Sequence, residues 1–567
     1  MERPRRLGVS QIQNFLNESS DEDDLFADSG SAYSPSEKSN IDSEDGENTQ
    51  PGRAYDEEME IDRGNESAID EIDGGNESAM DENDGENEST DDEIYEIERL
   101  EEDNVNEWPD DIIIWTDPQP TFKPRFTISQ ERIISNQGIT RGLTPLEVFF
   151  KLLPRSFIHH IVDCTNERID IHNISHVKNK RARTDFGEIL IILGCTFVMS
   201  YNRVPSLKDY FSNSPSLGNP YKKKAMSRDR FLHVMSKLYF SSLSYQPDPK
   251  PKTYFIDDLV NCLKSTFQKC RSDSPFQSID ESMTKFLGRS TLKQYMPLKP
   301  VKRGIKLWMR CDSMTGYTYD FNIYSGKEDN SHTSPTLGER VVMKLASTIR
   351  HPDTTLCFDR FFTSTKLINN IPFPALGTCI SNRKNLPKVT EKLNRGEYVF
   401  KCNSSGTLAV VWQDTKQVML LSNCHEATVG TVQRKQKDGT RVDVTCPDLV
   451  KTYRNIMGGV DLADKMVTLY ELDRKSAKWW RKVFFRLMMT CAVNAWITHA
   501  ETNHPRLKRE PFLGFLVELS ECLIDEGKKN AKIQRKVRTG PVSAMKKKIQ
   551  QNLGDHLPQR TKKRQRC

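Results

Sequence analysis

The sequence predicts an α/β core with helical segments on both sides and an acidic arm at its N-terminus. Strand-like runs at Leu307–Ser313, Tyr317–Ser325 and Thr354–Arg360 are separated by a helical stretch, Gly338–Ile349. Strands joined by a crossover helix indicate an α/β sheet. Helical patterns precede and follow this segment, and acidic residues gather in the first 111 positions.

Charge is divided unevenly along the 567 residues. Residues 1–111 hold 38 acidic and 7 basic side chains, a net charge of −31, whereas the remainder holds 41 acidic and 75 basic, a net charge of +34. A segment so acidic and so poor in aromatic residues buries too little apolar surface to order itself, so we expect a disordered tail. The basic remainder indicates a partner that is a polyanion.

Composition excludes several classes of protein. A chain of 567 residues is too long for one hydrophobic core, so two or more domains are expected. The most apolar window, Phe186–Ser200, is too short to span a bilayer and contains Glu188, which predicts a buried helix and no membrane partner. No secretory signal is visible, and the 13 cysteines are dispersed, which indicates a reducing compartment.

Further elements are expected on both sides of the core. Helices are predicted at Thr144–Pro154, where Pro145 suits a first helical turn, and at Ser227–Phe240. Strand-like runs recur within residues 397–444, so a small β-rich insert is expected there. The pattern becomes helical again from Asp461 onward.

Carboxylates in three segments suit metal-dependent chemistry on DNA. Asp280 follows an apolar residue, Asp359 ends a strand-like run, and Asp461 and Asp464 lie where a helix opens after two glycines. The last two, spaced i and i+3, share one helical face. Phosphodiester chemistry uses divalent metals held by several such carboxylates, and Mg²⁺ or Mn²⁺ accepts oxygen ligands.

Each carboxylate also has a structural interpretation. An Asp after a strand is most often a turn or cap residue. Asp461 is equally consistent with a helix N-cap, with Asp464 supporting the first turn. Spacing by itself therefore leaves the choice between a metal site and structural roles open.

Six longer stretches of sequence resemble the piggyBac transposase family, in the same order from Thr144 to roughly Asp555. They are SIDESMTKFLGR at Ser278–Arg289, KPVKRGIKLW at Lys299–Trp308, FDRFFTS at Phe358–Ser364, ALGT at Ala375–Thr378, YRNIMGGVDLADKM at Tyr453–Met466 and RKSAKWW at Arg474–Trp480. Together these stretches are specific for the family, although no single one of them is sufficient to identify it.

The resemblance implies an RNase H-like catalytic core with a DDD active site, a β-rich insertion and flanking helical segments for dimerisation and DNA binding. It places the catalytic, metal-holding residues at Asp280, Asp359 and Asp461, with a further essential carboxylate at Asp464. The implied activity is cut-and-paste transposition with Mg²⁺ or Mn²⁺. A metal-activated water nicks the element end, the freed 3′-OH attacks the opposite strand to form a hairpin, and a reopened end attacks a TTAA target. Phosphoryl transfer of this kind depends on positioning and charge neutralisation.

Candidate DNA-binding residues are the basic side chains near these words, together with one tryptophan. They are Lys299, Lys302, Arg303, Lys306, Arg383, Lys384, Arg474, Lys475, Lys478, Trp479 and Arg481. Lysines after the first carboxylate would neutralise phosphates, with a solvated strand edge as the alternative. The resemblance suits Trp479 to stacking on an unpaired base, with core packing as its alternative and as the stronger expectation for Trp480.

Two positions depart from the family pattern. Ile380 stands where members carry a basic residue used against target DNA, and Arg383 and Lys384 follow it. The family also ends in a cysteine-rich zinc module, and here Cys567 is the last residue, so we expect no zinc in this chain because one Cys does not build a tetrahedral site.

These inferences divide the chain into seven expected segments. They are an acidic tail (1–111), an N-terminal helical dimerisation and DNA-binding segment (112–274), a catalytic core in two parts (275–385 and 448–470) around a β-rich insertion (386–447), a C-terminal helical DNA-binding segment (471–527) and a basic tail (528–567).

Two functions remain in view. The first is a DNA transposase, a nuclear homodimer that acts on double-stranded DNA at transposon ends and TTAA targets. The second is a domesticated, transposon-derived DNA-binding protein that does not transpose. The basic tail favours nuclear import or DNA contact, with a solubilising end as its alternative.

Overall fold

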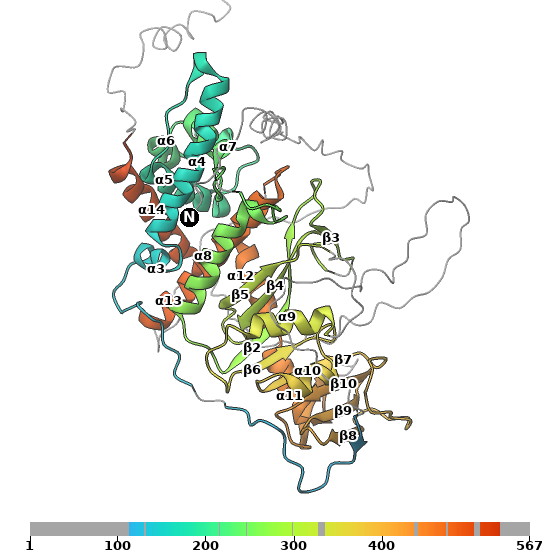
Figure 1. Cartoon of the computed structure of the whole chain (residues 1–567). Helices are drawn as coiled ribbons and strands as arrows, with labels where there is room; N and C mark the ends of the chain where they lie inside the picture. The colour runs from blue at the N-terminus through green and yellow to red at the C-terminus, as the bar shows by residue number, and fades with distance from the viewer. Residues whose placement is uncertain are drawn as a thin grey trace, which may run out of the picture.

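The computed structural model describes residues 113–129, 132–214, 216–244, 246–297, 299–326, 335–435, 440–471, 474–503 and 511–532. The predicted acidic tail and nearly all of the predicted basic tail lie outside these residues. Figure 1 shows a helical part at one end of the molecule and a sheet at the other, with α8 and α13 running between them.

A sheet of ten strands forms the core in the order β1-β8-β9-β10-β7-β6-β2-β4-β3, with β5 pairing β4. Strands β2, β6 and β7 are parallel neighbours, and the remaining pairs are antiparallel. The strands are β1 (Trp115–Thr116), β2 (Phe276–Lys285), β3 (Lys293–Tyr295), β4 (Arg303–Asp312), β5 (Thr318–Ile323), β6 (Thr355–Phe358), β7 (Ala375–Cys379), β8 (Tyr398–Asn403), β9 (Leu408–Gln413) and β10 (Gln417–Ser422).

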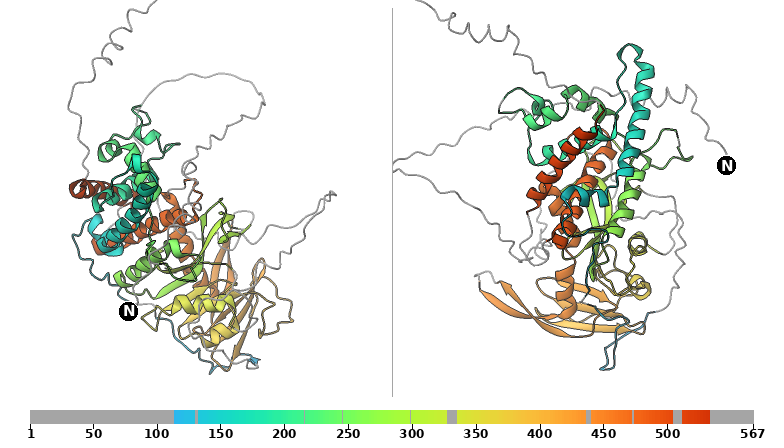
Figure 2. Two further views of the ribbon diagram at one scale, coloured as in Figure 1. Left: turned by 45° about the horizontal axis from the view of Figure 1, so that its top comes forward. Right: turned by 90° about the vertical axis from the view of Figure 1, so that its left-hand side faces the viewer.

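The β-rich segment after residue 386 is divided between two sheets. Its first three strands extend the main sheet through β10, which pairs with β7. Its last two, β11 (Val429–Lys435) and β12 (Arg441–Pro447), form a separate two-stranded sheet. Figure 2 shows this hairpin projecting from the side of the molecule.

Helices cover both faces of the sheet and build the second part of the molecule. They are α3 (Pro145–Leu152), α4 (Arg155–Ser175), α5 (Phe186–Tyr201), α6 (Pro220–Ala225), α7 (Arg228–Lys237), α8 (Tyr254–Cys270), α9 (Leu337–Ala346), α10 (Thr365–Asn370), α11 (Asp448–Ile456), α12 (Gly459–Leu469), α13 (Trp479–Asn503) and α14 (Phe512–Asn530), with 3-10 turns at Val177–Asn179 and Asp209–Phe211.

Alternation along β6 assigns the faces of the sheet. Leu356 and Phe358 pack with buried residues of α9 and α10, whereas Cys357 packs with those of α11 on the opposite face. Successive side chains of a strand point to opposite faces, so Asp359 leaves the strand toward the side of α11. Ile279 of β2 belongs to the α9 cluster, so Asp280 also points to the other face.

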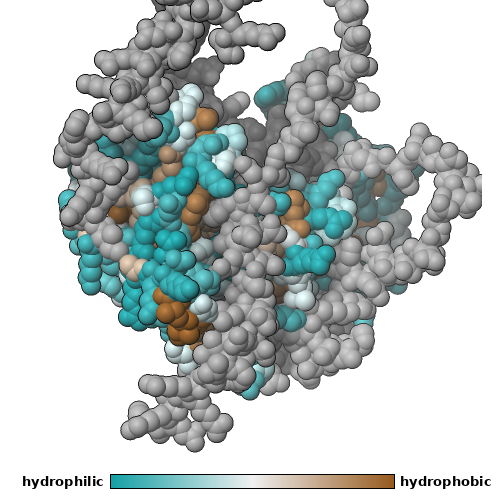
Figure 3. Space-filling view, turned by 90° about the horizontal axis from the view of Figure 1, so that it is seen from above, coloured by the Kyte–Doolittle hydropathy of each residue, from teal (hydrophilic) through white to brown (hydrophobic). Residues whose placement is uncertain are grey.

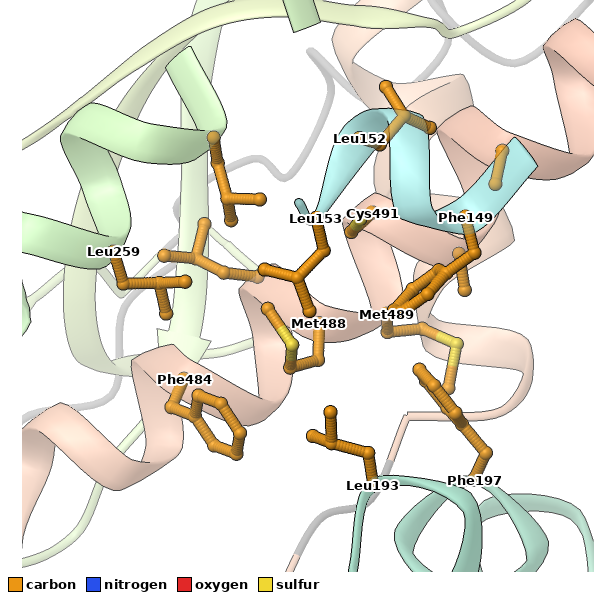
Figure 4. Packing of buried hydrophobic residues seen from close by; sticks show 14 of the residues in the cluster. Phe149, Leu152, Leu153, Leu193, Phe197, Leu259, Phe484, Met488, Met489 and Cys491 are labelled. Atoms are coloured by element: carbon orange, nitrogen blue, oxygen red, sulfur yellow. The ribbon is translucent and has the colours of Figure 1, made fainter. Parts of the chain in front are cut away.

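The helical part is organised around α13. Figure 4 shows Phe484, Met488 and Met489 of α13 among Phe149 of α3, Leu153 just after that helix, Leu193 and Phe197 of α5, and Leu259 of α8. Every one of these side chains is at most 3 % exposed. This packing explains why α13 is buried on nearly all sides despite its charged residues.

Several predicted helices are confirmed with their physical causes. Thr144 accepts a hydrogen bond from the backbone N–H of Glu147, whose carboxylate accepts one from the N–H of Thr144, so a capping box starts α3. The apolar window at 186–200 is α5, buried from Gly187 to Ser200 against α14. None of the helices in the described residues combines the length and apolar character that crossing a bilayer requires.

The segment before α3 runs along the sheet and was not predicted. Strand β1 pairs with β8, and the Trp115 indole donates a hydrogen bond to the Asn385 carbonyl at 2.9 Å. Arg132 then donates to the carbonyls of Asp273 and Ser274 near the start of β2. This strap links the far edge of the sheet to its centre.

Candidate active site

Parallel pairing of β2 and β6 places two of the predicted carboxylates side by side. Ile279 is the register partner of Phe358, so the next residues, Asp280 and Asp359, are neighbours where β6 ends. Asp280 is 8 % exposed in the middle of β2, and the Asp359 carboxylate accepts a hydrogen bond from the Phe361 N–H at 2.7 Å. Asp359 follows the end of its strand, as the strand-like run at Thr354–Arg360 predicted, whereas Asp280 lies within β2, a strand that the sequence analysis did not predict.

Helix α12 brings the third segment to the same face of β2. A Cβ atom added at Gly459 would lie 2.5 Å from the Ser278 Oγ and 2.7 Å from the Asp312 carbonyl oxygen, so only glycine permits this approach. Further along the helix, the Ser282 hydroxyl donates to Asp464 at 2.8 Å. Ser278 and Ser282 flank Asp280 on one face of the strand. Asp461 lies between these two contacts along the chain, is exposed, and is close enough to Lys299 for its charge to raise the pKa of that side chain.

The first two carboxylates lie in an environment that disfavours their charge. Burial, followed by the negative charge of Glu281, raises the pKa of Asp280 well above its usual range, and the charge of Asp359 adds to this. Burial and the same Glu281 raise the pKa of Asp359. Like charges withdrawn from water disfavour ionisation unless a cation compensates them.

Glu281 is part of the site, although the sequence analysis did not select it. Its carboxylate lies 3.1 Å from the Lys299 Nζ and 3.9 Å from the Lys306 Nζ. The Lys306 ammonium also lies 3.8 Å from the centre of the Trp308 ring. The sequence did contain a signal for this role, because Glu281 directly follows Asp280 and two lysines, Lys299 and Lys306, come soon after it in the chain.

Lys299 is the basic residue most closely coupled to the carboxylates. Desolvation opposes its charge, but the carboxylates of Asp280, Glu281 and Asp461 outweigh that effect and raise the pKa of Lys299. Lys299 and Lys306 thus form ion pairs with Glu281, and the negative charge of Asp280 acts on both. In the described part of the chain, no three His, Cys, Asp or Glu side chains are arranged closely enough to hold a metal ion as they stand.

Asp464 has different surroundings from the other three carboxylates. The buried Arg486 of α13 donates to the same oxygen of Asp464 that accepts the Ser282 hydroxyl. Arg486 also lies 3.4 Å from Glu471 and donates to the Ser282 Oγ at 3.2 Å. The metal-binding role of Asp464 stays a prediction. The sequence analysis did not select its neighbours Ser282, Glu471 and Arg486 as site residues.

The predicted DNA-binding residues divide by exposure. Lys302, Arg303, Lys384 and Lys475 are exposed. The Arg303 guanidinium lies 4.6 Å from the centre of the Tyr295 ring, which is itself 49 % exposed.

Other predicted DNA-binding residues are engaged within the chain. Arg474 donates to the carbonyls of Val204 and Pro205, and Arg481, which is 6 % exposed, donates to the Ser236 carbonyl. Lys478 donates to the Tyr239 hydroxyl at 3.2 Å. These three side chains tie the start of α13 to the helical part.

The two tryptophans at the start of α13 differ. Trp480 is 4 % exposed and its ring lies 4.6 Å from that of Tyr239, so the expectation of core packing is confirmed. Trp479 is half-buried at the edge of the same core.

Arg383 lies in the loop after β7, beside the residues that follow Asp359, because its guanidinium donates a hydrogen bond to the Arg360 carbonyl at 3.1 Å.

Comparison with known proteins agrees with this arrangement. The family described as Transposase IS4 matches residues 144–496. The chain is 26% identical over 381 residues to human PiggyBac transposable element-derived protein 3, covering 64% of this chain and 62% of the relative. It is 27% identical over 406 residues to human PiggyBac transposable element-derived protein 2, covering 68% and 66%. The chain therefore spans less than two thirds of the length of these relatives.

A solved structure shares the fold. The piggyBac transposase in a synaptic complex with hairpin DNA, determined by cryo-EM, matches with a TM-score of 0.61 at 24% identity, covering 76% of this chain and 89% of that one. The family match spans helices α3 to α12 and most of α13, strands β2 to β12 and every carboxylate of the site. The chain belongs to the Transposase IS4 family, of piggyBac type.

Proposed function

We propose that this chain is a metal-dependent DNA transposase of the cut-and-paste type. The observation that carries the proposal is the pairing of Asp280 with Asp359 from two parallel strands, with helix α12, which carries Asp461, packed closely against β2. The strand order β5-β4-β2-β6-β7, antiparallel on one side of β2 and parallel on the other, supports an RNase H-like core.

The carboxylates fit a divalent cation such as Mg²⁺ or Mn²⁺. Their oxygen atoms are the ligands that these ions accept, and the raised pKa values of Asp280 and Asp359 reflect buried negative charge that Lys299 offsets only in part. When bound, such ions polarise a scissile phosphate and lower the pKa of an attacking water. Asp461 is exposed, so its side chain has room to turn toward the other two.

The chain's own residues supply charge neutralisation around these carboxylates. Lys299 and Lys306, held by Glu281, place two ammonium groups beside Asp280, where a DNA phosphate has to enter. Arg303 and Tyr295 extend a basic and aromatic surface from there along the edge of the sheet. The proposed reaction is hairpin formation at element ends, followed by joining to a TTAA target.

The wider assignments follow from this proposal. We infer a homodimer acting in the nucleus on double-stranded DNA, with the chain divided at the boundaries 111, 274, 385, 447, 470 and 527. The human relatives and the synaptic complex support DNA as the partner, because they are transposon-derived or bound to hairpin DNA by their names.

Excision of a TTAA-flanked element from a plasmid tests the function. The wild-type chain, tested on an element whose ends are taken from the genomic sequence on either side of its gene, should excise that element with Mg²⁺ or Mn²⁺. Asp280→Ala, Asp359→Ala and Asp461→Ala should each lower excision by at least about a hundredfold, because transition-state charge loses its stabilisation. Lys465→Ala, at an exposed position of α12, should excise normally. Excision that is unchanged in Asp280→Ala would end the catalytic proposal.

One observation favours the alternative, a domesticated DNA-binding protein. Ile380, 37 % exposed just after β7, stands where the family resemblance expects a basic residue for target DNA. A wild-type chain that binds TTAA-containing DNA but excises nothing would establish this alternative. Gain of target joining by Ile380→Arg would then assign the loss to this position.

A further inference from the structure

A buried ion-pair network joins α12 to its neighbours directly behind the carboxylate cluster. Arg486 is 2 % exposed and lies between two acids, Asp464 of α12 and Glu471, which follows this helix. The Ser282 hydroxyl of β2 completes the network, donating to Asp464 at 2.8 Å and lying 3.2 Å from the Arg486 guanidinium. Strand β2, helix α12 and helix α13 therefore meet at one carboxylate.

The geometry of the two elements connects this network to Asp461. Asp464 lies three residues after Asp461 on the same face of α12. Ser282 lies two residues after Asp280 on the same face of β2. Fixing Asp464 against Ser282 therefore fixes the rotation of α12, and with it the direction in which Asp461 points from the helix.

We propose that Asp464 is a positioning residue, which acts through Arg486 and Ser282 to hold Asp461 opposite Asp280, and that it is not a metal ligand. The proposal rests on the metal site proposed above. One carboxylate oxygen of Asp464 already receives both the guanidinium and the hydroxyl. A divalent cation at that oxygen would lie against the buried positive charge of Arg486, which like-charge repulsion disfavours.

The charge balance gives a reason for Asp464 to be required without binding metal. A buried guanidinium that loses a partner is strongly destabilising, because its charge is then uncompensated in a low-dielectric environment. Asp464→Asn leaves Arg486 with Glu471 alone, at 3.4 Å and through a partly exposed side chain. The helix then loses its fixed orientation even though every proposed metal ligand is still present.

Soft-metal binding to cysteine variants of the full chain distinguishes a ligand from a positioning residue. Thiolate binds Cd²⁺ and gives a sulfur-to-metal absorption band, read as a difference spectrum against the wild-type chain, whose described cysteines are mostly buried. Asp280→Cys and Asp461→Cys should each show the band on addition of Cd²⁺. Asp464→Cys should not show it. Thermal melting of each variant reports whether it is folded.

A double-mutant comparison covers the case in which Asp464→Cys does not fold. We expect Asp464→Asn and Arg486→Gln each to raise the Mn²⁺ concentration at half-saturation, measured by electron paramagnetic resonance, by about tenfold, as loss of an outer-shell partner does. The double variant should be no worse than either single one, because both remove one interaction. Asp464→Glu should recover part of the affinity.

Each result has a distinct meaning. A Cd²⁺ band in Asp464→Cys, or a double variant whose loss is the product of the two single losses, overturns the positioning role and leaves the metal site intact. Absence of the band from Asp280→Cys and Asp461→Cys, with no Mn²⁺ binding by the wild-type chain, overturns the proposed metal site and the positioning role together.

Discussion

At the scale of single residues, the site is defined by which carboxylates have a cationic partner. Asp464 is neutralised by Arg486, and Glu281 by Lys299 and Lys306. Asp280 is surrounded mainly by negative charge, and its pKa is raised first by burial and then by Glu281. The same amino-acid type therefore serves different purposes within one cluster, depending on its immediate neighbours.

The raised pKa of Asp280 predicts a pH-dependent stability of the metal-free chain. A carboxyl whose pKa is higher in the folded than in the unfolded state lowers stability progressively as pH rises above its unfolded value, 3.8. At neutral pH, Asp280→Asn should therefore melt a few degrees higher than the wild-type chain in the presence of EDTA. The difference should shrink as pH falls toward 4, where the carboxyl of the unfolded chain also becomes protonated.

Asp443→Asn, an exposed carboxylate of β12, is the matched control and should show no such gain. Equal melting temperatures of Asp280→Asn and the wild-type chain at neutral pH would show that the buried charge of Asp280 does not destabilise the metal-free chain. Adding Mn²⁺ should reverse the order, because the cation stabilises only the chain that keeps its ligand.

At the scale of elements, the distance between α12 and β2 decides whether the third carboxylate reaches the site. That distance depends on Gly459, whose missing side chain leaves room for Ser278, the Asp312 carbonyl and Ser313. Two of these neighbours are backbone atoms, which do not yield as the end of a flexible side chain does. The two consecutive glycines in the sequence predicted a turn, and the structure shows close helix packing as well.

Gly459→Ala tests this element. The added Cβ would lie 2.7 Å from the Asp312 carbonyl oxygen, so α12 has to move away from β2. We expect a loss of about 1–3 kcal/mol of stability, as for other overpacked contacts. Mn²⁺ binding should weaken as well, because Asp461 moves with the helix.

Thr468→Ala, at an exposed position of the same helix, should change stability by less than about 0.5 kcal/mol. Chemical denaturation gives the free energy of unfolding, and electron paramagnetic resonance gives the Mn²⁺ affinity. A Gly459→Ala variant with wild-type metal affinity would show that Asp461 is not placed by this contact.

At the scale of the whole molecule, the strap before α3 fixes where the acidic arm joins the folded part. The Trp115 indole is hydrogen-bonded to the carbonyl of Asn385, the residue after Lys384. Because Trp115 lies close to the end of the acidic arm in the chain, the folded part begins near the loop that carries Arg383 and Lys384. Figure 3 shows that the face seen from the helical end is mainly hydrophilic, with apolar side chains in separate spots. A net charge of −31 is therefore attached beside basic side chains of a part whose net charge is +34.

Deletion of residues 1–111 should tighten DNA binding at low salt. We expect the arm to compete with phosphates for the same basic surface, and because salt screens such competition, the gain should decrease as ionic strength rises. Fluorescence anisotropy with a TTAA-containing duplex measures the effect. A chain in which the Asp and Glu residues of positions 64–85 are replaced by Asn and Gln keeps the length and should show part of the gain. Unchanged affinity at low salt would refute the competition.

The predictability of the molecule follows the range of the interactions that shape it. Helix α3 was predictable because Thr144, Pro145 and Glu147 are local signals, and α5 because its apolar run permits only burial. Helices α4 and α8 were not predicted, since their partners come from distant segments. The positive charge of Arg474 and Arg481 made them candidates for DNA binding. Only the fold shows that both side chains donate hydrogen bonds to backbone carbonyls of the helical part.

The sequence by itself determined the stretches that resemble the piggyBac family, the division of charge along the chain, and the choice of Asp280, Asp359 and Asp461 as candidate catalytic residues. These features depend only on residue type and order. The tertiary structure decided which candidates meet, and that Glu281 belongs with the site while Asp464 is paired with Arg486. Such pairings join β2, α12 and α13 across about 200 positions of the chain, and contacts of that range arise from packing, which no local pattern encodes.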